Sequence, residues 1–382
     1  GKTPHRNFLQ YCIFITNFPK LIAGPIIRPH ELLPQIQDKA FGTFRFENIS
    51  VGLTIFIIGL FKKVVLADSM VPFVDPVFHA SALGTSIPLL EAWGATVAFA
   101  LQIYFDFSGY TDMAIGSARM FGLVLPLNFH SPYKATSIVE FWRRWHMSLT
   151  RFLRDYVYFP LGGSRTGRIK HMRNLFVTML LSGLWHGAGW TFVCWGALHG
   201  VALLLNHTWR SFFGKKEATH WFRSGFSWVL TCFVVLIGWV FFRAESFASA
   251  FHMIGSMLGA NGLSLPAFLQ AHLGSAGEWA LNHGVSFQLE KTLILLPGDW
   301  VDGASLIAGL LCIVLLFPNT QQYMRAFTPA YDAPEEQETK GVRYKSLWQP
   351  TTRRALGLSV LLIVTLMFLM LENQTEFLYF QF

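Results

Sequence analysis

The chain has 382 residues, of which 52% are hydrophobic, 16% are aromatic and only 14% are charged, and its formal net charge is +8 at pH 7. Soluble domains average about 25% charged residues, so this composition argues against a soluble fold of one or more domains. The four cysteines lie far apart inside apolar segments, which indicates small buried hydrophobic residues and excludes a disulfide framework or a cysteine metal site.

Seven apolar blocks are long enough, or nearly so, to cross the ~30 Å hydrocarbon core of a bilayer, which takes about 20 helical residues. They predict an all-α, multi-pass integral membrane protein. Block 355–371 is uninterrupted, whereas 304–317 is short, and the prolines of 8–27 predict a broken or re-entrant segment. The blocks are 8–27, 51–67, 89–105, 174–206, 225–242, 304–317 and 355–371.

A polar segment, YFDFSGYTDMAIG (104–116), follows the third block and contains Asp106 and Asp112. The two carboxylates are open to two interpretations. They are either paired intramembrane groups of a proton path, or structural groups that fix helices together or cap a helix beginning near Thr111. We favour the structural role.

Segment 140–158, EFWRRWHMSLTRFLRDYVY, predicts one amphipathic helix at the membrane interface. At 100° per residue, most of its aromatic and aliphatic side chains share an arc of about 160°, and its arginines lie on the opposite side. His146 falls at the edge of the apolar arc. It is expected either to bond a backbone carbonyl or to face a cavity inside the helix bundle, and the pattern does not choose between these.

Basic residues predict which side of the membrane this segment faces. Residues 140–173 contain eight basic and two acidic side chains, so the positive-inside rule places this stretch in the cytoplasm. A nucleic-acid role has little support, because membrane segments flank the cluster.

Loop 207–224 is also basic, which constrains the block before it. If both flanks are cytoplasmic, 174–206 must enter the membrane and return as a re-entrant segment or helical hairpin, with a turn near Gly187 and Gly189. The remaining blocks then cross the membrane in alternating directions. That places the C-terminal tail, ENQTEFLYFQF, at or near the outer face.

His186 lies in the apolar stretch LLSGLWHGAGW (180–190). An ionisable side chain at membrane depth is costly unless it meets a cavity or a partner, so a functional role is the first hypothesis and a structural hydrogen bond the alternative. Gly183 and Gly187 permit close helix approach. Three tryptophans are expected to wall off the site: Trp185, Trp190 and Trp195.

Other chemistries have little support in the sequence. On one continuous helix His199 would lie about 140° from His186, so the two would not share a ligand face. The chain has no HExxH, GxSxG, P-loop or GxGxxG motif, which argues against metal, serine-hydrolase and nucleotide-hydrolysing sites. We expect no metal.

Five segments between residues 14 and 382 resemble the membrane-bound O-acyltransferase (MBOAT) family. Within it, the bacterial branch that acetylates exopolysaccharides such as alginate or cellulose is most similar, and D-alanyl transfer to teichoic acids is a more distant role. The resemblance implies a single MBOAT-type helical bundle over 1–382, lacking additional N-terminal membrane helices of the family. The segments are FPKLIAGPIIRPHEL, YFDFSGYTDMAIG, EFWRRWHMSLTRFLRDYVYFPLGGSR, SGLWHGAGWTFVCWGALHG and FLYFQF.

The same resemblance implies roles for individual residues. His186 matches the catalytic histidine of the family's GxWHG motif, and His146 matches a second functional histidine that ends its WRRWH motif. Cytoplasmic arginines are expected to receive the phosphates of acetyl-CoA. These are Arg143, Arg144, Arg165 and Arg168. Supporting roles are expected for Asp106, Asp112, Trp185 and Asn174.

The expected reaction is acyl transfer in the inner membrane of a bacterium. A buried, neutral His186 would deprotonate an acceptor hydroxyl as it attacks the acetyl-CoA carbonyl, while His146 orients a substrate or polarises the carbonyl. The acceptor would be an exopolysaccharide, reached directly or through a periplasmic relay protein, within a lipid-embedded exopolysaccharide synthesis complex. The alternatives are a transporter or proton-relay channel, a D-alanyl transferase, and a non-enzymatic scaffold.

Overall fold

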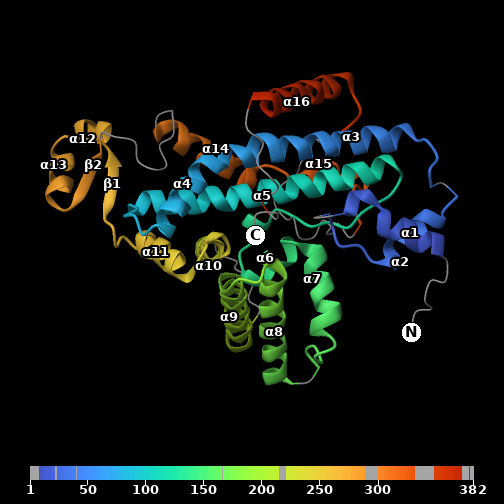
Figure 1. Cartoon of the computed structure of the whole chain (residues 1–382), viewed down its shortest axis with the longest axis horizontal. Helices are drawn as coiled ribbons and strands as arrows, with labels where there is room; N and C mark the ends of the chain where they lie inside the picture. The colour runs from blue at the N-terminus through green and yellow to red at the C-terminus, as the bar shows by residue number, and fades with distance from the viewer. Residues whose placement is uncertain are drawn as a thin grey trace.

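The computed structural model describes residues 8–21, 24–39, 41–165, 167–214, 221–288, 300–331, 348–371 and 378. This part of the chain is mostly helical, in agreement with the predicted all-α fold, and two short parallel strands, β1 (Leu263–Pro266) and β2 (Val285–Gln288), lie with α12 and α13 at one end of the molecule (Figure 1). The longer helices are α3 (Phe46–Phe61), α4 (Val71–Ala82), α5 (Leu89–Met120), α8 (Arg168–His186), α9 (Trp190–Phe213), α10 (Trp221–Arg243), α11 (Phe247–Met257), α14 (Trp300–Leu316) and α16 (Thr352–Leu371). The shorter ones are α1 (Phe8–Thr16), α2 (Pro29–Gln37), α6 (Ile138–Arg144), α7 (Met147–Leu153), α12 (Ala267–Leu273), α13 (Ser275–Asn282) and α15 (Thr320–Tyr323).

Within the described residues, three helical stretches are long and apolar enough to cross a membrane. They are Phe46–Ala82, Ser224–Arg243 and Thr352–Leu371, and a shorter apolar helix covers Gly303–Leu316. These match four of the seven predicted blocks and support a membrane protein, while the number of passes stays a prediction. The first block is broken as expected, because α1 ends at Thr16 and a separate 3₁₀ turn follows.

The centre of the molecule is α5, which lies antiparallel to α3 along its length (Figure 1). The expectation of a helix beginning near Thr111 is wrong, since α5 is continuous from Leu89 to Met120. The carboxylate of Asp112 does not cap its own backbone. It bonds side chains on neighbouring elements instead, and this leaves the helical hydrogen bonds of α5 uninterrupted.

Two pairs of glycines bring the backbones of α3 and α5 into direct contact. A Cβ added at Gly116 would lie 2.5 Å from the carbonyl oxygen of Gly52, and one at Gly109 would lie 2.7 Å from that of Gly59. The pairs are seven residues apart on each helix, so they fall on the same faces. Any larger side chain at these positions would push the two helices apart.

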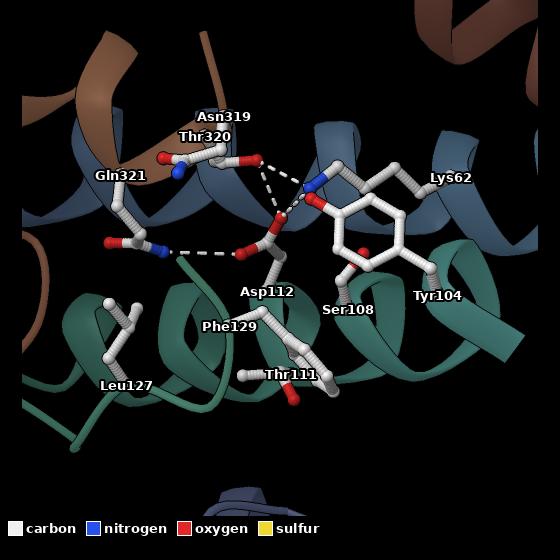
Figure 2. A pocket seen from close by; sticks show the side chains of 10 residues that line it. All are labelled: Lys62, Tyr104, Ser108, Thr111, Asp112, Leu127, Phe129, Asn319, Thr320 and Gln321. Atoms are coloured by element: carbon white, nitrogen blue, oxygen red, sulfur yellow. Dashed lines mark hydrogen bonds and ion pairs between the residues drawn. The ribbon is translucent and has the colours of Figure 1, made fainter. Parts of the chain in front are cut away.

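A buried polar cluster connects α5 with the chain after α3 and with α15 (Figure 2). The Lys62 Nζ lies 2.6 Å from Asp112 Oδ2 and 2.8 Å from the Thr320 hydroxyl oxygen. Thr320 also donates to Asp112 Oδ2 at 2.6 Å, and Gln321 donates to Oδ1 at 3.2 Å. A buried charge pair is tolerated when its remaining hydrogen-bonding capacity is filled, and here both carboxylate oxygens have partners.

A second buried pair lies one residue along the chain. The Lys63 Nζ is 3.0 Å from Asp106 Oδ1 and 2.6 Å from Asp68 Oδ1. The other Asp106 oxygen accepts the backbone N–H of Leu378 at 3.2 Å, and Leu378 is buried. The C-terminal tail therefore reaches the bundle interior at this residue, and its placement at or near the outer face of the membrane stays a prediction. The rest of the tail and residues 215–220 of the basic loop lie outside the described residues.

The predicted hairpin is present. Helix α8 ends at His186, α9 begins at Trp190, and the turn between them contains Gly187 and Gly189. The two helices lie side by side below α6 in Figure 1. A Cβ at Gly196 would lie 2.4 Å from the Met179 carbonyl oxygen, so the helices touch through their backbones. Whether the hairpin re-enters a membrane stays a prediction.

Substituting Gly116→Ala tests the contact between α3 and α5. The new methyl group meets backbone at 2.5 Å, so we expect the free energy of unfolding in detergent to fall by about 1–3 kcal/mol. Gly357→Ala on α16 is the matched control, because its Cβ meets nothing within 4 Å. Equal stability of the two variants in a thermal or denaturant melt would contradict the proposed backbone contact.

Replacing Lys62 by Met leaves the Asp112 carboxylate buried without its countercharge. We expect the single variant to lose about 3–5 kcal/mol of stability, as is typical when one partner of a buried pair is removed. The double variant Lys62→Met/Asp112→Leu removes both charges and should regain most of that loss. Additive losses in this double-mutant cycle would show that the pair is not coupled.

Candidate active site

His146 lies at a break between two short helices, which corrects the prediction of one helix over 140–158. Helix α6 ends at Arg144 and α7 begins at Met147, and His146 has the left-handed φ of 43°. The cause is hydrogen bonding to the loop that precedes α6. The backbone of Asn128 accepts the Met147 N–H at 3.0 Å, and the Arg144 carbonyl accepts the His130 N–H at 3.0 Å, which uses backbone groups that a continuous helix would pair internally.

The break turns the His146 side chain into the protein. His146 is 5% exposed, its Nδ1 lies 3.3 Å from Asn128 Oδ1, and the Phe107 ring contacts its ring edge to face at 4.8 Å. Burial, with a contribution from nearby His186, lowers the pKa of His146 well below its ordinary value. The ring is therefore neutral at physiological pH. Of the two alternatives left open, this geometry corresponds to an inward-facing side chain.

His186 is the last residue of α8, and its ring is 6.3 Å from that of His146, centroid to centroid. It is partly buried and contacts the rings of Trp195 and Phe242, each at 5.2 Å. The fold thus brings together the two histidines that the sequence singled out, although they come from different elements. Aromatic side chains of α9 and α10 form the wall beside them.

The tryptophans contribute unequally to this wall. Trp195 is 1% exposed and touches His186, whereas Trp185 and Trp190 are largely exposed. Trp185 packs against Phe152 at 5.9 Å, and its part in closing the site stays a prediction.

His199 is fully buried, and it lies on α9 rather than on the helix of His186. The angle of about 140° expected between His199 and His186 on one continuous helix therefore does not apply. The His199 ring stacks on Phe141 at 6.2 Å and meets Trp195 at 5.0 Å, so Trp195 contacts both histidines. Among the described residues, neither ring nitrogen of His199 has a hydrogen-bond partner.

A mainly apolar pocket of about 310 Å³ lies between α6–α7 and α8–α9. Leu149, Met179 and Leu203 line it, and Ser182 places a hydroxyl in its wall one helical turn before His186. Another part of the wall carries Arg143, Arg154, Tyr158, His171 and His207. Burial lowers the pKa of both His171 and His207 below the ordinary value, and nearby charged groups add to the effect at His207, so positive charge at this pocket comes from the arginines.

The four arginines expected to bind phosphate have different surroundings. Arg143 and Arg165 are exposed, and Arg168 is exposed while donating to the Ser211 hydroxyl at 2.8 Å. Arg144 is buried, bonds Glu140 at 2.8 Å and donates to the His130 carbonyl. Its guanidinium is thus bound to groups inside the protein, and these contacts support the α6–α7 break.

Three of the expected supporting residues, Asn174, Asp106 and Asp112, make structural contacts. Asn174 is fully buried and donates to the carbonyls of Leu161 and Gly163, which holds the loop before α8 against that helix. Asp106 and Asp112 take part in the lysine pairs described above. In the described part of the chain no group of three or more histidine, cysteine or acidic side chains is arranged to hold a metal ion.

Two residues at the site escaped the sequence analysis. Asn128 bonds His146, and Ser182 lies in the pocket wall near His186. Neither stands in a pattern with a chemical meaning of its own, and Asn128 reaches its partner only because loop 121–137 folds back on α6. A polar residue flanked by apolar ones in the stretch VLPLNFH was the only signal available.

Comparison with known proteins shows the family of this chain. The family model described as MBOAT, membrane-bound O-acyltransferase family, matches residues 3–251. A peptidoglycan O-acetyltransferase of Helicobacter pylori is 45% identical over 72% of this chain, and the matched region is 50% of that protein. A probable alginate O-acetylase AlgI of Pseudomonas putida is 36% identical over 100% of this chain and 71% of its own length. A teichoic acid D-alanyltransferase of Bacillus subtilis is 28% identical over 61% of each chain.

The chain spans about half the length of the Helicobacter pylori relative, and the family model covers well over half of the chain. The WRRWH and GLWHG segments that place His146 and His186 side by side both lie inside the matched region. The chain belongs to the membrane-bound O-acyltransferase family.

Proposed function

We propose that this chain is a membrane-embedded O-acetyltransferase of the bacterial inner membrane that moves an acetyl group from cytoplasmic acetyl-CoA toward a hydroxyl of an exopolysaccharide. The observation that carries the proposal is the His146–His186 pair, whose ring centroids are 6.3 Å apart, together with a pocket that has Ser182, one helical turn before His186, and arginines in its wall. The names of the relatives, an alginate O-acetylase and a peptidoglycan O-acetyltransferase, favour a polysaccharide acceptor. The acceptor is reached directly or through a periplasmic partner protein.

In the proposed mechanism His186 is the general base. It takes the proton of the acceptor hydroxyl as that oxygen attacks the thioester carbonyl of acetyl-CoA. The tetrahedral intermediate then collapses, the carbon–sulfur bond breaks, and the proton passes from His186 to the departing sulfur. The products are an acetyl ester and free CoA, so protons balance without another reactant. The aromatic wall of Trp195 and Phe242 limits the access of water that would hydrolyse the thioester.

The pocket is proposed as the site of the donor's pantetheine arm. Its volume of about 310 Å³ suits a slender, largely apolar chain rather than the whole of CoA. Ser182, one turn before His186, would mark the thioester end. Arg143 in the wall and the exposed Arg165 and Arg168 nearby in sequence would pair with the nucleotide phosphates. Arg144 is omitted from this set because it is held by Glu140.

The lysine partners of the two buried aspartates favour this proposal over a proton-relay transporter. Asp106 and Asp112 each lie within 3.0 Å of a lysine amine, so they form fixed ion pairs rather than a chain of exchangeable sites. A D-alanyl donor would use the same histidines. An assay that measures transfer from each donor separates it from acetyl-CoA.

Substituting His186→Gln should lower acetyl transfer from acetyl-CoA by at least about 10²-fold, the usual contribution of a general base. The protein should still fold, because glutamine keeps much of the volume. His79→Gln on the exposed side of α4 is the control and should retain full activity. Transfer measured with purified protein and radiolabelled acetyl-CoA checks this, and an active His186→Gln variant would remove the histidine from the mechanism.

Arg143→Gln tests where the nucleotide of the donor lies. We expect KM for acetyl-CoA to rise several-fold, since one charge-assisted hydrogen bond to phosphate is lost, with kcat little changed. KM for acetyl-pantetheine, which lacks those phosphates, should not change. Arg353→Gln at the start of α16 is a matched control on an exposed arginine. An equal rise in KM for both donors would place the phosphates elsewhere.

A further inference from the structure

The side chain of Asn128 lies at a point where three hydrogen-bond donors meet. Its Oδ1 is 2.6 Å from the Ser148 hydroxyl oxygen, 3.3 Å from the Ser148 backbone nitrogen and 3.3 Å from His146 Nδ1. Its Nδ2 donates to the Thr111 hydroxyl oxygen of α5 at 3.3 Å. Asn128 is fully buried, so water does not compete for these bonds.

These contacts determine which way the amide faces. A backbone N–H can only donate, so the amide atom that meets the Ser148 nitrogen must be the carbonyl oxygen. The oxygen and nitrogen of an asparagine are normally assigned by such a network, and here a single obligatory donor is sufficient. The amide nitrogen is then the atom that meets Thr111.

The orientation of Asn128 fixes the tautomer of His146 in turn. The Asn128 oxygen carries no hydrogen, so the contact at 3.3 Å requires the proton on His146 Nδ1. In a neutral imidazole the other nitrogen then has a lone pair and no hydrogen. Nε2 lies on the ring edge away from Asn128, and no described residue forms a hydrogen bond with it.

We propose that Asn128 is a positioning residue that holds His146 as the Nδ1–H tautomer, so that Nε2 meets the reacting groups as a hydrogen-bond acceptor. The consequence for the reaction rests on the proposed function, whereas the tautomer itself does not. Polarising the thioester carbonyl requires an N–H, which Nε2 of this tautomer lacks. His146 therefore receives a hydrogen bond at the site, and of its two suggested roles only that of orienting a reacting group is retained. An N–H of His186, on the ring nitrogen that does not take the proton of the acceptor hydroxyl, is such a hydrogen-bond donor.

The direct test is the ¹⁵N NMR spectrum of protein labelled at its histidines, with His146 assigned by its absence in a His146→Gln sample. In the wild type we expect a protonated, pyrrole-type signal for Nδ1 and an unprotonated, pyridine-type signal for Nε2. Asn128→Asp keeps an oxygen acceptor and should keep this pattern. Asn128→Leu has a similar volume and no acceptor, so the pattern should become a mixture or reverse.

Thr111→Val is the matched control, because it removes the other partner of the Asn128 amide and leaves the oxygen facing His146. It should retain the wild-type NMR pattern. A wild-type spectrum with the proton on Nε2, or an unchanged pattern in Asn128→Leu, would overturn the proposal. If Asn128→Leu fails to fold, the wild-type and Asn128→Asp spectra still decide the tautomer.

Kinetics provide a second readout. In Asn128→Leu we expect kcat to fall at least about tenfold while KM for acetyl-CoA stays within about twofold, and Asn128→Asp should recover a large part of kcat. Equal losses in both variants would indicate a packing role and contradict the proposal. The NMR experiment needs no substrate, so failure of the acetyltransferase assay and failure of the tautomer proposal are distinguishable.

Discussion

The contact between loop 121–137 and the break after α6 is the constraint on which the candidate site depends. The loop supplies backbone partners to both sides of the break, through His130 to Arg144 and through Asn128 to Met147. Without these bonds, the residues from Ile138 onward would favour one amphipathic helix, with His146 at the edge of its apolar face. With them, His146 takes a left-handed backbone conformation that is costly for a non-glycine residue and points into the bundle.

That contact requires a rigid support, and α5 provides it. Its backbone packs directly on α3 through paired glycines, and its two aspartates are bound by the lysines that directly follow α3. The same helix presents Thr111 to Asn128 and Phe107 to His146. Charged groups inside an apolar bundle are expensive singly, so their pairing fixes the relative position of the helices that carry them. The same contacts of α5 therefore support the site and stabilise the bundle.

The histidines themselves come from elements that approach from different sides. His146 belongs to the α6–α7 break, and His186 ends the first helix of a glycine-rich hairpin. Because the hairpin helices touch through Gly183 and Gly196, His186 and Trp195 are held close together. Preorganised side chains on packed helices position a reacting group more accurately than side chains on a free loop.

Particular elements show which features of the fold and site the sequence predicts. Composition and apolar blocks were sufficient for the helical membrane class, and the glycines for the hairpin turn at 187–189, because both depend on local residue properties. The family motifs singled out His146 and His186. The continuous helix over 140–158 and a helix start near Thr111 were wrong, since each is decided by a neighbour far away in the chain.

The order of residues alone is thus enough to name the chemical groups and their medium: apolar helices, a basic stretch, and two histidines whose burial costs free energy. Which of these groups meet depends on tertiary contacts. Asn128 reaches His146 through a loop, Lys62 and Lys63 neutralise aspartates on another helix, and Leu378 bonds Asp106 from the far end of the chain. Periodicity reports the faces of one element, whereas such hydrogen bonds and ion pairs depend on distances between elements, which no local pattern contains.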